Sequence, residues 1–375
     1  MTVFVPFVDL SIQHQAIQSE IETTLLEVVR QGHFVLGEAL TQFETDFALA
    51  SGGTQGIGVG SGTDAIALGL QACGVGAGDE VLVPANTFIA TLIGVLRAGA
   101  KPVLVDCCLD TALIDLTAAA QAVTSQTKAI VPVHLYGQMV SPTALQDFAT
   151  AHNLLIFEDS AQAHLAQREG YTAGSVGIAA AYSFYPSKNL GSFGDGGMVV
   201  TQDEAIAQKI RCYRNYGAAQ KYLHTEPGLN SRLDNLQAAI LGVKLPHLKT
   251  WNQQRNEAAQ IYAQALVPLQ IRGIIPLTNE SGSGHVYHLY VVRVDERSPL
   301  NRDQLRSKLS DRGIQTGIHY PIPCHLQPAY KFLNYEAGDF PNAEQLCQEI
   351  LSLPMYPGLS SKKIQTVAAT IEETI

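Results

Sequence analysis

The feature that most constrains this chain is a series of short apolar runs that alternate with Ala/Leu-rich segments of helical spacing from residue 57 onward. Strands that alternate with helices at such intervals predict βαβ units, and therefore a mostly parallel sheet covered by helices on both faces. The expected strands are IGVG, EVLVP, PVLVD, AIVPVHL, LLIFEDS, AAAYSFY and GGMVVT. The sequence therefore predicts an α/β fold with a large, mostly parallel sheet.

The two ends of the chain follow other patterns. Apolar residues recur at helical spacing within residues 15–50 and predict two helices, and a long helical stretch over 203–265 is interrupted at Pro246. Beyond it, HVYHLYVVRV reads as a strand and NRDQLRSKLSDRG as a helix. At 375 residues the chain exceeds the usual size of one core. We expect a large α/β domain over residues 1–245 and a smaller C-terminal α+β domain over 246–375.

Charge and composition exclude several classes of partner. The net charge is −10 and no Lys/Arg cluster is present, so nucleic acid and anionic membrane surfaces are not expected partners. No window reaches the eighteen or so apolar residues that a membrane span requires. The six cysteines are scattered without a CxxC pair, which indicates reduced thiols. We expect a cytoplasmic protein.

The stretch GVGSGTDAIALGL, residues 58–70, predicts a strand that turns directly into a helix. Free backbone N–H groups and the positive end of the helix dipole at such a turn suit a phosphate. An ordinary turn that needs small residues is an equally good interpretation of this stretch alone. The dinucleotide fingerprint GxGxxG is a poorer one, because its third glycine falls on Thr63.

A second candidate lies in LLIFEDSAQAHLA, where an apolar strand ends in Glu158, Asp159 and Ser160. Ligands of open α/β sheets bind at the carboxyl ends of the strands, so one of these carboxylates could face a cationic ring nitrogen. The alternative is that Asp159 or Ser160 caps a following helix.

The third candidate is Lys188 in SFYPSKNLGSFGDGG. A lysine in a glycine-rich turn is usually only solvated, but one among small residues in a partly dry site can have a lowered pKa and form an imine with a carbonyl. A phosphate turn, a strand-end carboxylate and a loop lysine, in this order on one α/β scaffold, are the contacts that pyridoxal 5′-phosphate requires.

These motifs occur together with PANTFIAT, RNYG, GLNSRLDNLQAAIL and GIHYPIPCHLQPAY, in order along nearly the whole chain. In this the sequence resembles the nucleotide-sugar aminotransferases of the DegT/StrS group, which belong to fold-type I of the pyridoxal-phosphate enzymes. The resemblance implies that Lys188 forms the covalent link to the cofactor and acts as general acid and base. It also implies that Asp159 pairs with the pyridinium nitrogen, that Gln162 contacts the ring hydroxyl, and that Phe88 stacks on the ring.

The resemblance further assigns the phosphate to Gly62, Thr63 and Ser183, with Asn230 reaching it from a second subunit of a homodimer with shared active sites. A cap on a helix that begins near Ser231 is the alternative role of Asn230.

The loop of residues 314–330 is fixed by prolines and belongs to the smaller domain, so we expect its residues His319 and Tyr320 to line the sugar pocket. His319 and His325, with Cys324 beside the latter, superficially suggest metal binding, but no HxxxH or CxxC spacing supports a site and we expect none.

The predicted activity is transfer of an amino group from glutamate to the 3-keto group of a dTDP-linked keto-6-deoxyhexose, which gives a dTDP-3-amino-3,6-dideoxyhexose. The first alternative is a C4 aminotransferase on a UDP-, GDP- or dTDP-sugar. Cofactor-binding regulators and dehydrases are a further class, but the dehydrases of this group carry histidine where Lys188 stands. A Rossmann-type oxidoreductase is the poorest fit, because of the missing glycine.

Overall fold

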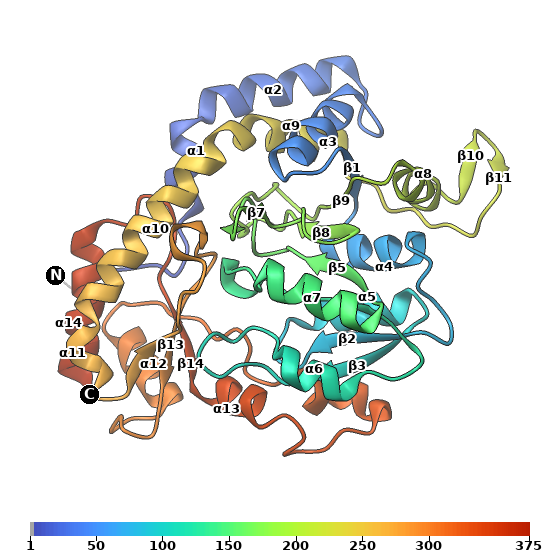
Figure 1. Ribbon diagram of the computed structural model, residues 1–375. Helices are drawn as coiled ribbons and strands as arrows, with labels where there is room; N and C mark the ends of the chain where they lie inside the picture. Colours follow the sequence, from blue (N-terminus) through green and yellow to red (C-terminus); the bar gives the residue numbers. More distant parts are fainter. Residues whose placement is uncertain (1–3) are drawn as a thin grey trace.

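A seven-stranded sheet, in the order β1-β9-β8-β5-β4-β2-β3, forms the centre of the computed structural model, which describes residues 4–375 (Figure 1). Its strands are β1 (Gln55–Val59), β2 (Glu80–Pro84), β3 (Lys101–Val105), β4 (Thr127–Ile130), β5 (Leu155–Asp159), β8 (Ala179–Ser183) and β9 (Gly197–Thr201). The pairs β2–β3, β2–β4, β4–β5 and β5–β8 are parallel. The prediction of an α/β fold with a mostly parallel sheet is therefore confirmed.

One strand runs against the others. β9 lies between β1 and β8 and is antiparallel to both, with Thr201 opposite Gln55 on one side and Ala179 on the other. Antiparallel neighbours need no crossover helix, and residues 184–196 connect β8 to β9 directly. This connection begins at the carboxyl end of β8 and contains Lys188. The lysine therefore lies near that edge of the sheet.

Helices cover both faces of the sheet, because each β-strand buries side chains alternately on its two sides. Leu68, Phe157 and Val199 belong to the core on one face, and Phe43, Tyr182 and Met198 to the core on the other. The helices of this part are α3 (Glu38–Ala50), α4 (Gly62–Ala72), α5 (Ile89–Arg97), α6 (Leu116–Ala122), α7 (Pro142–His152), α8 (Glu204–Tyr213) and α9 (Asn235–Lys244).

The C-terminal part has its own antiparallel sheet, β12-β13-β14, and its own core. Its elements are α10 (Leu248–Ala265), α11 (Val267–Gln270), β12 (Ile274–Pro276), β13 (Tyr290–Val294), α12 (Arg302–Asp311), α13 (Pro341–Glu349), β14 (Ile350–Leu353) and α14 (Ser361–Thr374). Pro246 lies in the 3₁₀ turn Leu245–His247 between α9 and α10, where the chain enters this part.

We propose residues 245 and 246 as the boundary between the two domains, because the two cores are separate clusters and α10 begins just beyond it. Each core also takes residues from the other side of this boundary. Val5 is buried in the smaller core, and Leu346 of α13 belongs to the core of the large sheet.

The remaining elements are short or peripheral. They are α1 (Leu10–Ala16), α2 (Gln18–Gln31), β6 (Gln167–Arg168), β7 (Tyr171–Thr172), β10 (Ala218–Gln220) and β11 (Leu223–His224). The β10–β11 hairpin projects from the body of the molecule, at the right of the view in Figure 1. Within residues 4–375, no helix combines the length and the apolar character that crossing a membrane would demand.

Candidate active site

A cavity of about 470 Å³ opens where the parallel strands end. It is lined by nine of the ten residues that the sequence predicted for a site, which are Gly62, Thr63, Phe88, Asp159, Gln162, Ser183, Lys188, His319 and Tyr320. They come from the carboxyl ends of β5 and β8, from the segments that follow β1, β2, β5 and β8, and from the loop after α12. Asn230 is the tenth, and it is exposed and outside this cavity.

Asp159 is the last residue of β5, and its side chain is buried in the cavity wall at 4% exposure. It accepts hydrogen bonds from the Thr91 hydroxyl at 2.7 Å and from the backbone N–H of Ala161 at 3.1 Å. Burial raises the pKa of Asp159, while these two hydrogen bonds and the charge of Lys188 lower it. A cationic group against this carboxylate would favour its ionised form further.

The interpretation of Asp159 or Ser160 as a helix cap is wrong. Residues 160–166 form consecutive turns, and the strands β6 and β7 follow them. The Asp159 side chain accepts the Ala161 N–H at 3.1 Å, as an N-cap would, but no helix follows it. Gln162 therefore reaches the cavity from a turn and not from the first turn of a helix.

The adjacent carboxylate, Glu158, points to the opposite side of β5 and does not line the cavity. It is fully buried and accepts three backbone N–H groups from residues 174–177 at 2.8 to 2.9 Å. The ring of His134 lies 2.9 Å from the same carboxylate. Glu158 thus holds the chain together, and Asp159 is left as the carboxylate available for chemistry.

Lys188 lies in the wall between β8 and β9. Burial lowers its pKa to about 8, and the nearby Asp159 opposes that shift. About a tenth of this amine is therefore unprotonated at pH 7, far more than for an ordinary lysine, and a nucleophile or proton acceptor must be unprotonated. The glycines of the loop are needed for close packing, since a Cβ on Gly197 would lie 2.4 Å from the Ser61 backbone and one on Gly191 2.3 Å from the Pro186 carbonyl.

The N-terminus of α4 forms another side of the cavity. Ser61 caps the helix, and its hydroxyl accepts the Asp64 N–H at 3.1 Å. The first N–H groups of a helix have no partner within it, so those of Gly62 and Thr63 can face an anion. A Cβ on Gly62 would lie 2.8 Å from the Cβ of Ser183, which explains the glycine and places the serine against the same turn. The arrangement suits a phosphate.

Gln162 is oriented by two tyrosines. Its Oε1 accepts the backbone N–H of Tyr136 at 2.7 Å, and its Nε2 donates to the Tyr320 hydroxyl at 3.2 Å. The Tyr136 hydroxyl in turn donates to the carbonyl of His319. The ring of Tyr320 lies 5.1 Å from that of Phe88, tilted by 33°, and Phe88 is 49% exposed. The rings of Phe88 and Tyr320 thus form an apolar part of the cavity wall, and the Gln162 amide adds a polar group beside them.

His319 is fixed by residues of both ends of the chain. Its Nδ1 lies 2.9 Å from the Ser352 hydroxyl, and its ring stacks on Phe7 at 5.6 Å. Burial lowers the pKa of His319 to about 4, so the ring is neutral at physiological pH. His325 bonds instead to Glu344 at 3.0 Å. Among residues 4–375, no three His, Cys, Asp or Glu side chains are arranged to hold a metal ion.

Asn230 does not cap a helix, so this alternative is also wrong. α9 begins at Asn235 with Asp234 as its N-cap, and Asn230 pairs instead with Asn215 as an isolated bridge. The long polar segment before it forms the projecting β10–β11 hairpin, whose Tyr222 is 85% exposed. Just after Asn230, Ser231 accepts the Gly60 N–H and donates to Asp64, which ties this segment to the phosphate turn.

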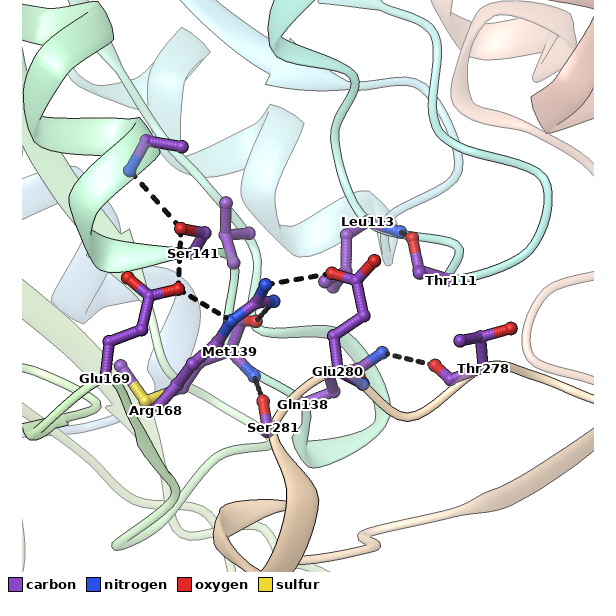
Figure 2. A network of polar contacts seen from close by, with 12 residues as sticks. Thr111, Leu113, Gln138, Met139, Ser141, Arg168, Glu169, Thr278, Glu280 and Ser281 are labelled. Atoms are coloured by element: carbon purple, nitrogen blue, oxygen red, sulfur yellow. Dashed lines mark hydrogen bonds and ion pairs between the residues drawn. The ribbon is translucent and has the colours of Figure 1, made fainter.

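A polar network outside the cavity lining connects residues 138–141 and 168–169 with the segment 278–281 (Figure 2). Arg168 donates to the Met139 carbonyl at 2.9 Å and lies 3.2 Å from Glu169 and 3.0 Å from Glu280. Gln138 accepts the Glu280 N–H and donates to the Thr278 carbonyl. These contacts hold the connection to β13 against the turn that carries Tyr136.

Among the cavity residues that the sequence did not predict, Thr91 and His288 bear most on the chemistry. Thr91 bonds Asp159 from α5, and its only signal was its place in the NTFIAT motif, four residues after Thr87. His288 lines the cavity just before β13, in a segment that reads as an apolar strand. A histidine within an apolar, strand-like segment was the signal that could have identified it.

Comparison with known proteins agrees with this geometry. Residues 15–372 match the model of the DegT/DnrJ/EryC1/StrS aminotransferase family, and the chain belongs to that family. The predicted resemblance and the prediction of a pyridoxal-phosphate-dependent aminotransferase are therefore confirmed.

Three similar proteins illustrate the relationship. A "Pleiotropic regulatory protein" of Geobacillus stearothermophilus is 45% identical over 98% of each chain. The dTDP-3-amino-3,4,6-trideoxy-α-D-glucose transaminase of Streptomyces venezuelae is 42% identical over 98% of this chain and 96% of its own. The crystal structure of S. venezuelae DesV in complex with a ketimine intermediate superposes with a TM-score of 0.94 at 42% identity, over 99% of this chain and 98% of that one.

The cavity fits pyridoxal 5′-phosphate in the chemistry of its groups. It offers a buried carboxylate without a fixed cation, an amine of lowered pKa and a helix N-terminus that suits a phosphate. When bound, this cofactor supplies an aldehyde that takes up the amine and a ring that withdraws electrons from the carbon bearing the nitrogen.

Proposed function

We propose that this enzyme transfers an amino group from glutamate to the 3-keto group of a dTDP-linked keto-6-deoxyhexose and so gives a dTDP-3-amino-3,6-dideoxyhexose. The observation that carries the proposal is the single cavity in which Lys188, Asp159 and the α4 N-terminus meet. The names of relatives then indicate which class of keto-sugar is the substrate.

In this proposal each residue of the cavity has one task. Asp159, held by Thr91 and the Ala161 N–H, keeps a proton on the ring nitrogen of the cofactor. Gln162 contacts the ring hydroxyl, Phe88 covers the ring, and Lys188 carries protons to and from the carbon that gains the amine. Gly62, Thr63 and Ser183 hold the phosphate, and His319 and Tyr320 face the sugar.

The position of the new amine is inferred from names that relatives carry. Besides the S. venezuelae enzyme, a protein 41% identical to this chain is named a dTDP-3-amino-3,6-dideoxy-α-D-galactopyranose transaminase. Both names place the amine at C3. These names support amination at C3 over amination at C4. They also support a dTDP-linked substrate over other nucleotide sugars, but this support is weaker.

A UDP-sugar is the second candidate substrate. One relative, 41% identical over 99% of this chain, is named a UDP-N-acetyl-3-dehydro-α-D-glucosamine 3-aminotransferase. The regulatory name of the G. stearothermophilus relative raises a non-enzymatic role as well. Lys188, with its lowered pKa, and the adjacent Asp159 are the groups that amino transfer requires, and catalysis is the role that we propose.

We further propose that the active unit is a cytoplasmic homodimer in which Asn230 of one chain reaches the cofactor phosphate of the other. Asn230 is exposed, lies outside the cavity of its own chain, and follows a projecting hairpin with exposed Tyr222 and Leu223. All six cysteines are free, as a reducing compartment keeps them.

The test is amino transfer from glutamate to a panel of dTDP- and UDP-linked 3-keto and 4-keto sugars, with the position of the new amine determined by NMR. We expect turnover of the dTDP-3-keto sugar, and none in a Lys188→Ala variant that keeps the fold by circular dichroism. Faster turnover of a UDP-sugar or a 4-keto sugar would replace the proposed substrate. Undiminished turnover in Lys188→Ala would refute the proposed role of the lysine.

A further inference from the structure

His288 is the one histidine of the cavity wall that is bonded to the neighbour of Lys188. Its side chain is 8% exposed and lines the cavity, and its Nδ1 lies 3.2 Å from Oδ1 of Asn189. Within residues 4–375, its Nε2 has no hydrogen-bond partner. The question is which ring nitrogen carries the proton, because this decides what His288 can bind.

The hydrogen bonds of Asn189 and Asn252 determine which ring nitrogen of His288 is protonated. Nδ2 of Asn252 donates to the His164 carbonyl at 2.9 Å, so Oδ1 of Asn252 must be the acceptor for Asn189. Nδ2 of Asn189 donates both to that oxygen and to the Val286 carbonyl, each at 2.9 Å. Main-chain carbonyls can only accept, so neither amide can be turned over without placing two oxygens in contact. Oδ1 of Asn189 is therefore an acceptor, and Nδ1 of His288 carries the proton.

The surroundings also keep this ring neutral. Lys188 and His319 share the cavity with it, His164 lies behind it, and the Arg255 guanidinium donates to the His288 carbonyl at 3.3 Å. Burial and these four groups hold the pKa of His288 well below its ordinary value. Two carboxylates line the same cavity: Asp159, which is bonded to Thr91 and Ala161, and Asp195, which makes no hydrogen bond to His288. Nε2 therefore keeps a free lone pair.

We propose that His288 is a substrate-recognition residue that presents a hydrogen-bond acceptor and no donor to the cavity, with Asn189 and Asn252 as the positioning residues that fix this tautomer. The inference rests on the proposed function for the identity of the donor, which is a hydroxyl group of the keto-sugar. An acceptor without a proton cannot bind the carboxylates of glutamate or a phosphate oxygen, because these groups only accept.

The tautomer is measured in holoenzyme labelled with ¹⁵N-histidine, with the His288 signal identified by its loss in His288→Phe. We expect a protonated Nδ1 and an unprotonated Nε2 at neutral pH. Asn189→Ala should give a mixture of tautomers. Asn256→Ala is the matched control, because Asn256 donates to the Ser283 and His285 carbonyls of the same segment without touching His288. A protonated Nε2 in the wild type would overturn the inference.

Recognition is tested by kinetics and by binding. His288→Phe should raise KM for the nucleotide sugar about tenfold, the effect of one lost hydrogen bond, and leave KM for glutamate unchanged. Equal rises for both substrates, or none, would overturn the recognition role. A holoenzyme with the predicted tautomer that binds no nucleotide sugar would instead refute the proposed function, so the two failures are distinguishable.

Discussion

The Thr91 hydroxyl donates a hydrogen bond to Oδ2 of Asp159 at 2.7 Å, although the two residues are 68 positions apart. The Thr87 hydroxyl lies 2.9 Å from that of Thr91, so a short chain of hydroxyl groups ends at the carboxylate. Asp159 is buried, and each donor that it keeps favours its ionised form.

Replacement of Thr91 by valine keeps the shape of the side chain and removes this donor. A buried carboxylate that loses one hydrogen bond is destabilised by roughly 1–3 kcal/mol, so we expect the pKa of Asp159 to rise and kcat to fall about tenfold. Thr87→Val is the control, since it removes only the outer hydroxyl and should cost less. An equal loss in both variants would contradict a direct role of the Thr91 hydroxyl.

The neighbouring carboxylates Glu158 and Asp159 should respond in opposite ways to amidation. Glu158→Gln places an NH₂ or an oxygen of lower charge among three backbone donors, and we expect a loss of about 3 kcal/mol in the free energy of unfolding. Asp159→Asn should leave the stability of the cofactor-free protein equal or higher, because burial disfavours that charge, and should reduce kcat about 100-fold. Denaturant unfolding and kinetics on both variants check this contrast.

Lys188 should make the cofactor-free protein less stable at neutral pH. Its pKa in the folded state, about 8, is below the ordinary value of 10.5, so between these values the unfolded chain binds more protons. Stability therefore rises as pH increases from 8 to 10.5. We expect Lys188→Met to raise Tm at pH 7, by about 2–4 °C for each kcal/mol, with a smaller gain at pH 10. A gain that does not change with pH would point to packing instead.

Tyr136→Phe removes the hydroxyl that holds the His319 carbonyl but keeps the backbone N–H that binds Gln162. We expect KM for the nucleotide sugar to rise several-fold, as it should in His319→Ala and Tyr320→Phe, with KM for glutamate less affected. Tyr290→Phe is the matched control, because that hydroxyl is also buried and has no hydrogen-bond partner within residues 4–375. A similar effect of both tyrosine variants would indicate general loosening.

Shared active sites are tested by mixing chains. A dimer of a Lys188→Ala chain and an Asn230→Ala chain has one site with both lesions and one with neither, if Asn230 acts across the interface. Activity should then partly return on mixing. Absence of recovery after subunit exchange, confirmed by mass spectrometry, would mean that each chain builds its site alone.

The sequence by itself determined the class of fold and most of the site. Apolar runs that alternate with helical segments place successive strands parallel, and parallel strands bring their carboxyl ends to one edge. Asp159 ends a strand and Gly62 and Lys188 follow strands closely, so their meeting followed from the pattern. The family motifs supplied Gln162, Phe88, His319 and Tyr320.

The tertiary structure decided what depends on contacts between distant segments. Local pattern could not show which of Glu158 and Asp159 enters the cavity, because alternation along a strand fixes opposite sides but not which side is the cavity. It could not show that turns rather than a helix follow Asp159 either, because a bond from the Ala161 N–H to this side chain is compatible with both. Thr91 and the tautomer of His288 are fixed by partners many residues away, and hydrogen bonds of that kind leave no periodic signal in the sequence.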